Sequence, residues 1–293
     1  MPYRKLALLV LSICSSALSS RAGADEPYQQ SENVTYAEVH GVGLVLDTFS
    51  PTEEKNGRAI IDVASGAWHS DRGKIRDHHR AGVFRIMCEK GFTVFAVRPG
   101  SITKFSAGEM VDHVKTAIRW VKDRGDEYDI DPDRLGLMGA SAGGHLATLA
   151  AVTADDSTRV GAVAAFFPPT DFLDYGGRRL DRSGEDEMGT LVRRLAFPAG
   201  ESDGKTQEEI AAALGAISPA RLVTSHAPPF LLIHGDADPA VPLQQSQVMV
   251  AALKEKGVPA ELIVKPGGAH PWPTIHEEVA IMADWFFRQL GSE

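Results

Sequence analysis

The segment Arg134-Leu-Gly-Leu-Met-Gly139-Ala-Ser141-Ala-Gly143-Gly144-His145 decides the fold class of this chain. It begins as an apolar run of strand length and leads into an alanine-rich stretch, 142–153, that favours a helix. Gly-x-Ser-x-Gly between a strand and a helix is the pattern of a nucleophile elbow, in which the serine sits on a sharp turn between two glycines that avoid clashes. The alternative is an ordinary flexible Gly/Ser turn, but the flanking strand and helix favour Ser141 as a nucleophile.

Segments of strand and helix pattern alternate along the rest of the chain. Apolar runs typical of buried strands occur at 59–64, 92–97, 134–138, 160–167, 230–233 and 260–264, and helical patterns at 78–90, 107–124, 142–153, 243–256 and 274–290. Strands separated by helices of this length predict right-handed crossovers and a mostly parallel central sheet with helices on both faces. The sequence therefore predicts an α/β fold.

Two segments depart from this alternation. Val34 to Val39 and Leu44 to Thr48 are short β-prone runs joined through glycines, which predicts an antiparallel hairpin, while 25–33 is polar and expected to lack regular structure. Residues 171–220 are charged and weakly periodic, with one clear helical stretch at 207–214. We expect 171–220 to be a small lid-like insertion in a single domain that spans 25–293.

The first 24 residues have the pattern of a secretory signal peptide. Arg4 and Lys5 precede an apolar run at 6–13, and Ala22-Gly23-Ala24 is a small-x-small cleavage site. A frayed N-terminal helix is the alternative. The pattern predicts a mature chain that begins near Asp25 and is secreted or periplasmic. No other stretch is long and apolar enough to cross a bilayer, so no stable membrane insertion is expected.

Composition excludes several classes of partner. The 293 residues are 43% hydrophobic and 24% charged, as in ordinary globular proteins, and the formal net charge is −9. The chain has no basic cluster of the kind that binds nucleic acid. Signal removal would leave one cysteine, Cys88, in an apolar stripe where burial is expected. No metal-ligand spacing is present, and the adjacent His78 and His79 are expected to be surface or structural residues, so no metal or cofactor is predicted.

A nucleophilic serine needs a general base, and that base needs an orienting acid. In folds with a nucleophile elbow the chain order is serine, acid, histidine. Asp238 follows the apolar run at 230–233, with Asp236 as the rival acid in the same turn. His270 lies in the loop after the last expected strand, and His276, at the start of the final helix, is the rival base. The order therefore favours Asp238 and His270.

An oxyanion needs two backbone N–H donors beside the nucleophile. Ala142, at the start of the helix after Ser141, is one natural donor, because helix N-termini favour negative charge. The second is expected from Ser65-Gly66-Ala67-Trp68, either Gly66 or Ala67, although an ordinary strand-to-helix turn is the alternative there. Trp68 and Trp272 are expected on the walls of the substrate pocket.

Three segments together resemble the esterases of the α/β-hydrolase superfamily. They are Ser65 to Trp68, Gly139 to His145, and the pair formed by His234-Gly-Asp-Ala-Asp238-Pro and Gly267-Gly-Ala-His270. The chain is similar, over about 44–290, to bacterial acetylxylan and feruloyl esterases, which are related to the hormone-sensitive-lipase-like carboxylesterases. The resemblance implies the α/β-hydrolase fold, a Ser141–His270–Asp238 triad, no cofactor, and a small-molecule or polysaccharide ester as substrate.

The chain departs from that family pattern at two places. Ala64 and Ser65 stand where His and the first Gly of a His-Gly-Gly-Gly or His-Gly-Gly-Ala loop would be, and Arg98-Pro-Gly replaces the more usual Tyr-Arg, which predicts a changed cleft floor. Two rival functions follow. A prolyl-oligopeptidase-like peptidase shares the triad but usually carries a propeller domain, for which this chain is too short. A catalytically inactive binding protein stays open because of Ala64-Ser65.

Overall fold

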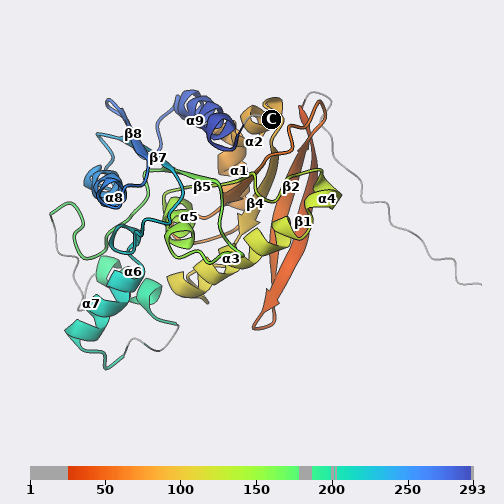
Figure 1. Cartoon of the computed structure of the whole chain (residues 1–293). Coiled ribbons are helices and arrows are strands. Elements are labelled where there is room, and N and C mark those ends of the chain that lie inside the picture. The colour runs from red at the N-terminus through yellow and green to blue at the C-terminus, as the bar shows by residue number, and fades with distance from the viewer. Residues whose placement is uncertain (1–25, 178–186, 199–200, 202, 292–293) are drawn as a thin grey trace, which may run out of the picture.

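The computed structural model describes residues 26–177, 187–198, 201 and 203–291, and its centre is a single eight-stranded sheet (Figure 1). The strands are β1 (Tyr28–Val39), β2 (Val42–Pro51), β3 (Ala59–Val63), β4 (Thr93–Arg98), β5 (Leu135–Ala140), β6 (Ala162–Phe166), β7 (Phe230–Gly235) and β8 (Ala260–Lys265). Their order across the sheet is β1-β2-β4-β3-β5-β6-β7-β8. The predicted signal peptide lies outside the described residues.

The sheet is mostly parallel, as the sequence predicts. Among the strands of the described ranges, β1 with β2 and β2 with β4 pair antiparallel, and every pair from β4 through β8 is parallel. The strand order reverses around β3, which lies between β4 and β5. Because ligands of such sheets bind at the carboxyl ends of the strands where the order reverses, the loops after β3 and β5 mark the expected position of the site.

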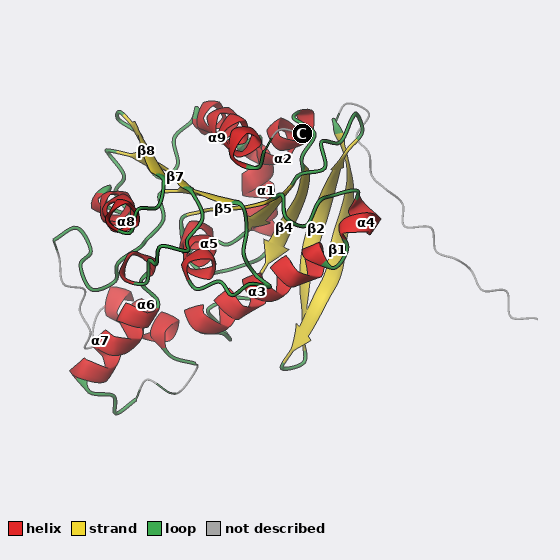
Figure 2. Ribbon diagram, in the orientation of Figure 1, coloured by secondary structure: helices red, strands yellow, loops and turns green. Residues whose placement is uncertain are grey.

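Helices cover both faces of the sheet (Figure 2). One apolar cluster joins the sheet to α3, α5 and α8, and a second joins it to α1, α2 and α9. The bounds are α1 (Arg72–Arg80), α2 (Val83–Glu89), α3 (Ala107–Lys122), α4 (Gly125–Tyr128), α5 (Ala142–Val152), α8 (Gln244–Glu255) and α9 (Ile275–Gln289). This layering confirms the predicted α/β class.

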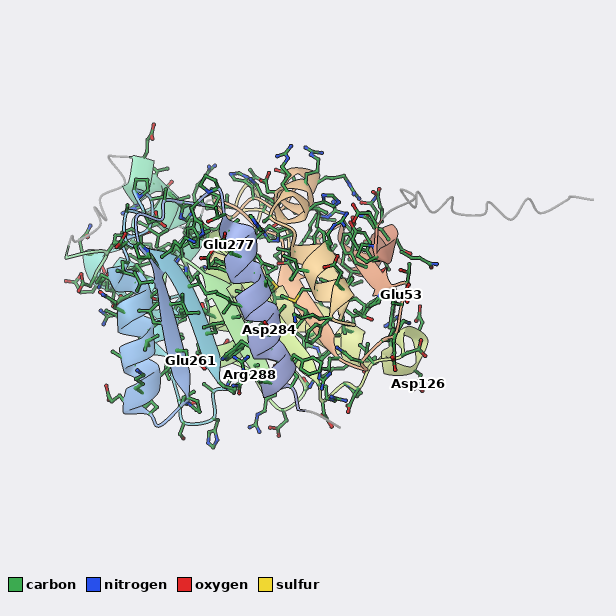
Figure 3. The ribbon with its side chains drawn as sticks, turned by 90° about the horizontal axis from the view of Figure 1, so that it is seen from above. Glu53, Asp126, Glu261, Glu277, Asp284 and Arg288 are labelled. Atoms are coloured by element: carbon green, nitrogen blue, oxygen red, sulfur yellow. The ribbon has the colours of Figure 1, made fainter. Side chains whose placement is uncertain are left out.

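The final helix shows how one side of an amphipathic helix is fixed to the sheet. Trp285 and Phe286 are buried, and the Trp285 indole donates a hydrogen bond to Glu261 on β8 at 2.9 Å. Glu277, Asp284 and Arg288 lie on the side of α9 that faces away from the sheet (Figure 3). None of the helices in the described ranges is both long and apolar enough to cross a bilayer.

Two expectations about element boundaries were wrong. Part of 25–33 is not irregular, because β1 begins at Tyr28, which pairs with Pro51 of β2 and packs its ring edge-on against Phe49 at 5.2 Å between centroids. The helical pattern at 78–90 is divided between α1 and α2 at Gly82, whose φ of 78° is left-handed and favours glycine.

Cys88 is buried, as predicted. Its thiol contacts the Phe49 carbonyl at 3.6 Å, and burial raises the pKa of the thiol well above its ordinary value. The thiolate is therefore strongly disfavoured.

Residues 171–220 leave the sheet between β6 and β7. Their described part contains α6 (Glu187–Ala196), α7 (Gln207–Ala216) and the short helix η1 (Pro219–Arg221). α6 packs against α7 and α3, and η1 contacts α5 and α8, so the excursion adjoins the helical layer over the first apolar cluster (Figure 1). Phe172 and Val192 of this excursion line one pocket together with Ser141, which follows β5.

Candidate active site

Ser141 sits at the junction of β5 and α5 in a backbone conformation that few residues adopt, with φ of 53° and ψ of −120°. The motif glycines explain how the turn closes. A Cβ on Gly139 would lie 2.4 Å from the Gly143 carbonyl carbon, and a Cβ on Gly143 would lie 2.1 Å from the Val63 carbonyl oxygen. Neither position has room for any side chain, so the turn requires glycine at both.

Gly143→Ala is expected to lower the free energy of unfolding by about 3 kcal/mol, because its methyl group collides with backbone atoms of β3. Urea unfolding followed by circular dichroism measures the change. Gly108→Ala is the matched control, since an added Cβ at that position in α3 meets nothing within 4 Å. The free energy of unfolding of this control is expected to exceed that of wild type by no more than about 1 kcal/mol. Equal losses in the two variants would contradict the steric explanation.

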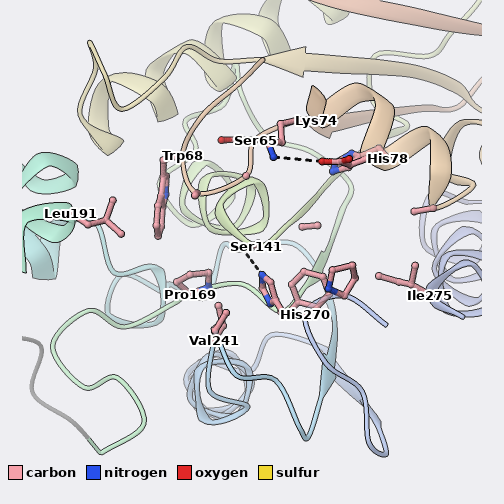
Figure 4. Close-up of a pocket in the computed structure, with 18 of the residues that line it drawn as sticks. Ser65, Trp68, Lys74, His78, Ser141, Pro169, Leu191, Val241, His270 and Ile275 are labelled. Atoms are coloured by element: carbon pink, nitrogen blue, oxygen red, sulfur yellow. Dashed lines mark hydrogen bonds and ion pairs between the residues drawn. The ribbon is translucent and has the colours of Figure 1, made fainter. Parts of the chain in front are cut away.

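Three side chains from separate loops form one hydrogen-bonded chain, of which Figure 4 shows the contact between Ser141 and His270. His270, in the loop between β8 and α9, has Nε2 2.9 Å from the Ser141 hydroxyl. Its Nδ1 lies 2.6 Å from Oδ2 of Asp238, which follows β7 and has a side chain with 0% exposure. The structure therefore brings together the serine, histidine and acid that the sequence favoured.

The Asp238 carboxylate is held by its own loop. The backbone N–H groups of Ala240 and Val241 donate to its Oδ1 at 2.8 and 2.9 Å, and His234 Nε2 lies 3.5 Å from its Oδ2. Burial opposes ionisation, but the hydrogen bonds from His234, His270 and the two N–H groups outweigh it and hold the pKa of Asp238 well below its ordinary value. Asp238 is consequently a carboxylate at neutral pH.

The rival acid and base are engaged elsewhere. Asp236 accepts a hydrogen bond from the Gly267 N–H at 2.7 Å and so fastens the β7 turn to the loop that carries His270. His276 lies in the first turn of α9, next to the junction of α1 and α2. A Cβ added to Gly82 at that junction would lie 3.8 Å from the Cβ of His276. Asp236 is thus a brace of the turn rather than the partner of His270.

The loop after β3 lies beside the turn that carries Ser141, and its hydrogen bonds decide between Gly66 and Ala67 as the candidate oxyanion donor. The Gly143 N–H donates to the Ser65 carbonyl at 3.0 Å, which ties this loop to the start of α5. The Gly66 N–H already donates to the His69 carbonyl at 3.0 Å, leaving Ala67, with φ of 47°, as the candidate of the two. Ala142 is the first residue of α5, so its N–H belongs to the free donors of a helix N-terminus.

Trp68 anchors the same loop to the helix beneath it. Its indole N–H donates to Nδ1 of His145 at 3.0 Å, and Nε2 of His145 donates to the Ile217 carbonyl at 2.7 Å. Burial lowers the pKa of His145 to about 4, so the ring is neutral and bridges the two partners. The sequence located His145 under the elbow but gave no sign of this bridge, which joins segments far apart in the chain.

A pocket of about 480 Å³ opens over Ser141 and His270. The Phe167 ring, which also lines it, packs on His270 with 4.2 Å between centroids. Among the residues that the structure describes, no group of three or more His, Cys, Asp or Glu could hold a metal ion. The remaining apolar wall combines the β3 loop with residues of and around the 171–220 excursion, namely Trp68, Pro169, Phe172, Tyr175, Leu191, Val192 and Val241.

One expectation about the pocket was wrong. Trp272 does not line it: the side chain is 5% exposed, packs on Phe166 and Phe167, and donates to Glu278 at 2.7 Å. Phe167, which packs on His270, lines the pocket instead. Arg98 does not line the pocket, and its guanidinium pairs with the buried Asp47 of β2 at 3.3 Å.

His78 also lines the pocket, together with Lys74 and Asp77 of α1. The sequence gave His78 a surface or structural position, and its link to the site was missed. The available signal was Asp62, a carboxylate inside an otherwise apolar strand, because a buried charge requires a partner.

The parallel sheet, the elbow and the loops at its carboxyl edge define the α/β-hydrolase fold. Within this class the chain belongs to the BD-FAE family, whose model matches residues 46–253.

Curated relatives include two proteins of Mycobacterium tuberculosis (strain ATCC 25618 / H37Rv). The probable carboxylic ester hydrolase LipM is 28% identical over 78% of this chain and 52% of its own length. The esterase LipC is 31% identical over 68% of this chain and 49% of its own length. The chain therefore spans about half the length of these relatives.

Among solved structures, a truncated form of a carbohydrate esterase from gut microbiota has a TM-score of 0.77 and 27% identity. The likeness covers 93% of this chain and 99% of that one. An apo form of Thermogutta terrifontis esterase 2 has a TM-score of 0.67 and 25% identity, and covers 89% of this chain and 95% of that one. Both structures carry the fold described here.

Proposed function

We propose that this protein is a carboxylic ester hydrolase that uses Ser141 as a covalent nucleophile. The observation that carries the proposal is the hydrogen-bonded chain from Asp238 through His270 to Ser141 at the floor of the pocket. Membership of the BD-FAE family and relatives named as carboxylic ester hydrolases and esterases support it.

The first half-reaction transfers the acyl group to the enzyme. His270 Nε2 removes the proton of Ser141 as Oγ attacks the ester carbonyl carbon, and Asp238 stabilises the imidazolium that forms. The carbonyl oxygen becomes an oxyanion that the N–H groups of Ala142 and Ala67 stabilise, each such donor contributing about 100-fold or more in rate. His270 then gives its proton to the departing alcohol oxygen, and the carbon–oxygen bond of the ester breaks.

The second half-reaction releases the acid. A water molecule loses a proton to His270 Nε2 and attacks the carbonyl carbon of the acyl-enzyme. The tetrahedral intermediate collapses, the bond to Oγ breaks, and Oγ takes back the proton from His270. These steps use side chains and backbone groups of this chain alone.

Hydrolysis of p-nitrophenyl acetate and butyrate tests the activity, and a fluorophosphonate probe tests the nucleophile. We expect turnover of both esters, loss of turnover after labelling, and a probe adduct on Ser141 in the peptide mass spectrum. A prolyl peptide p-nitroanilide serves as the substrate for the rival peptidase and is expected to remain intact. Cleavage of the peptide alone would favour the peptidase, and the absence of both turnover and labelling would favour an inactive binding protein.

We also propose that the natural substrates are acetyl or feruloyl esters of polysaccharides. Support comes from the structural likeness to a carbohydrate esterase, and from a pocket that is open at the carboxyl edge of the sheet. Release of acetate from acetylated xylan, or of ferulate from feruloylated arabinoxylan, is the measurement. If p-nitrophenyl acetate is hydrolysed but neither polymer is, the polysaccharide proposal is wrong.

Export is a further part of the proposal. The pattern of residues 1–24 supports cleavage before Asp25 and activity outside the cytoplasm. Expression of the full chain followed by N-terminal sequencing of the exported protein tests it. A protein that keeps residues 1–24 and stays in the cytoplasm would contradict export.

A further inference from the structure

The wall of the pocket formed by α1 differs chemically from the opposite wall. Lys74, Asp77 and His78 face the cavity from α1, whereas the wall opposite is apolar. Figure 4 shows Lys74 and His78 on one side of Ser141, and Trp68 and Leu191 on the other. An ester bound across Ser141 therefore meets a polar side and an apolar side, and two chemically different halves of the substrate fit this division.

His78 is held in place from below by a buried carboxylate. Its Nδ1 lies 2.6 Å from Oδ2 of Asp62, which is on β3 in the centre of the sheet and has a side chain with 0% exposure. The other oxygen, Oδ1 of Asp62, is buried without a hydrogen bond among the described residues. His78 is thus the partner that offsets the cost of burying this charge, and the pair fixes the plane of the ring.

The second ring nitrogen of His78 is left for the pocket. Burial opposes its protonation, but the charge of Asp62 and the hydrogen bond to it outweigh burial and raise the pKa of His78. With Asp62 bound to Nδ1, Nε2 is the ring nitrogen that points away from the carboxylate. Within the described part of the chain Nε2 has no hydrogen-bond partner, and the side chain keeps 12% exposure on the cavity.

Lys74 extends the polar side to the oxyanion loop. Its stem lies over Gly66, where an added Cβ would come 2.9 Å from the Lys74 Cδ, and its Nζ pairs with Asp77 at 3.5 Å. On this wall each basic side chain is paired with an acidic one, Lys74 with Asp77 and His78 with Asp62. Because the wall offers donors and acceptors side by side, it suits neutral groups that donate and accept hydrogen bonds, such as sugar hydroxyls, better than an anionic group.

We propose that His78 is a specificity-determining residue that hydrogen-bonds a hydroxyl group of the substrate through Nε2, and that Asp62 is its positioning residue. The inference rests on the proposed esterase function and deepens it. The polar wall takes the hydroxylated half of a sugar ester, and the apolar wall takes the other half.

The test compares two acetate esters of similar ring size, a mono-O-acetylated methyl xyloside and cyclohexyl acetate, which has no hydroxyl group. Removing His78 alone would leave Asp62 buried and unpaired, so the main variant is Asp62→Val/His78→Leu, which removes both polar groups together. We expect kcat/KM for the xyloside ester to fall by between about 10-fold and 100-fold, mainly through KM. The kcat/KM for cyclohexyl acetate is expected to stay within about twofold of the wild-type value, because this ester has no hydroxyl group to bond to His78.

His79→Leu is the matched control, since its side chain is 51% exposed on the same helix and lies outside this pocket. This substitution is expected to leave kcat/KM for both esters unchanged. Equal losses for both esters in the double variant would overturn the proposal and give the pair a structural role, as would a wild type without preference for the hydroxylated ester. If the wild type hydrolyses neither of these esters nor p-nitrophenyl acetate, the proposed function itself is wrong.

Discussion

Ser141→Ala should reduce the kcat for p-nitrophenyl acetate by about 10⁶-fold, leaving only the residual catalysis that substrate binding and the oxyanion donors supply. Without Oγ no acyl-enzyme forms, and His270 has no hydroxyl at 2.9 Å from which to take a proton. The variant should keep its fold, because alanine has the same backbone requirements as serine at the φ of 53° and removes no buried packing. Initial rates at saturating ester and a thermal unfolding curve measure the two effects.

Ser157→Ala is the matched control, because that hydroxyl is exposed and bonds only within its own turn, to Asp155. It should retain full activity. A Ser141→Ala variant that keeps a tenth of the wild-type rate would show that another group is the nucleophile. If wild type and variant are equally inert, the Ala64-Ser65 departure becomes the leading cause, and an inactive binding protein is favoured.

The β3 loop holds its shape without the histidine of the family pattern. Ser65 accepts from the Gly143 N–H, the Gly66 and His69 backbones pair with one another, and Trp68 bonds to His145. These contacts tie the loop to α5 and across itself. The β3 loop, which we propose supplies an oxyanion donor, is therefore ordered by contacts other than those of the family motif, and this order favours activity despite Ala64 and Ser65.

The core of the sheet was predictable because its strands are short, apolar and bounded by clear turns. β1 was only partly recognised, since it lies at the sheet edge, buries only Tyr28 and Tyr36, and has no apolar run. The break between α1 and α2 was missed because the apolar stripe of α2 begins only at Val83 and α1 buries only Ile75, whereas the left-handed φ at Gly82 separates the two helices.

In the site, too, residues fixed by their local sequence context were predictable, whereas contacts between distant segments were not. Ser141, Asp238 and His270 were predictable because each follows its own strand at a set place in the chain order. Trp272 was misplaced because a tryptophan next to the loop histidine gives no indication of which way its ring turns; here it turns inward to Glu278. The Asp62–His78 contact is likewise between separate elements, and only the buried charge hinted at it.

Asp238→Asn should lower kcat by about 10⁴-fold with little change in KM. The N–H groups of Ala240 and Val241 require an oxygen at the Oδ1 position, which turns the amide nitrogen of the new asparagine toward His270. An amide N–H facing Nδ1 forces the proton of the neutral imidazole onto Nε2. His270 then donates toward Ser141 and is unable to accept its proton, although all heavy atoms remain in place.

The loss of kcat should come from Asp238 itself and not from a disturbance of the turn after β7. Asp236→Asn, in the same turn, is therefore the matched control. Asparagine keeps the oxygen that accepts from the Gly267 N–H, and its activity should remain near that of wild type. Because the pKa of Asp238 lies below the ordinary value of 3.8, the wild-type carboxylate contributes stability that is complete above that pH and lost only as the pH falls further. Asp238→Asn should therefore flatten the fall of stability in acid as well as remove activity. A variant pair in which Asp236→Asn is inactive and Asp238→Asn is active would reverse the assignment of the acid.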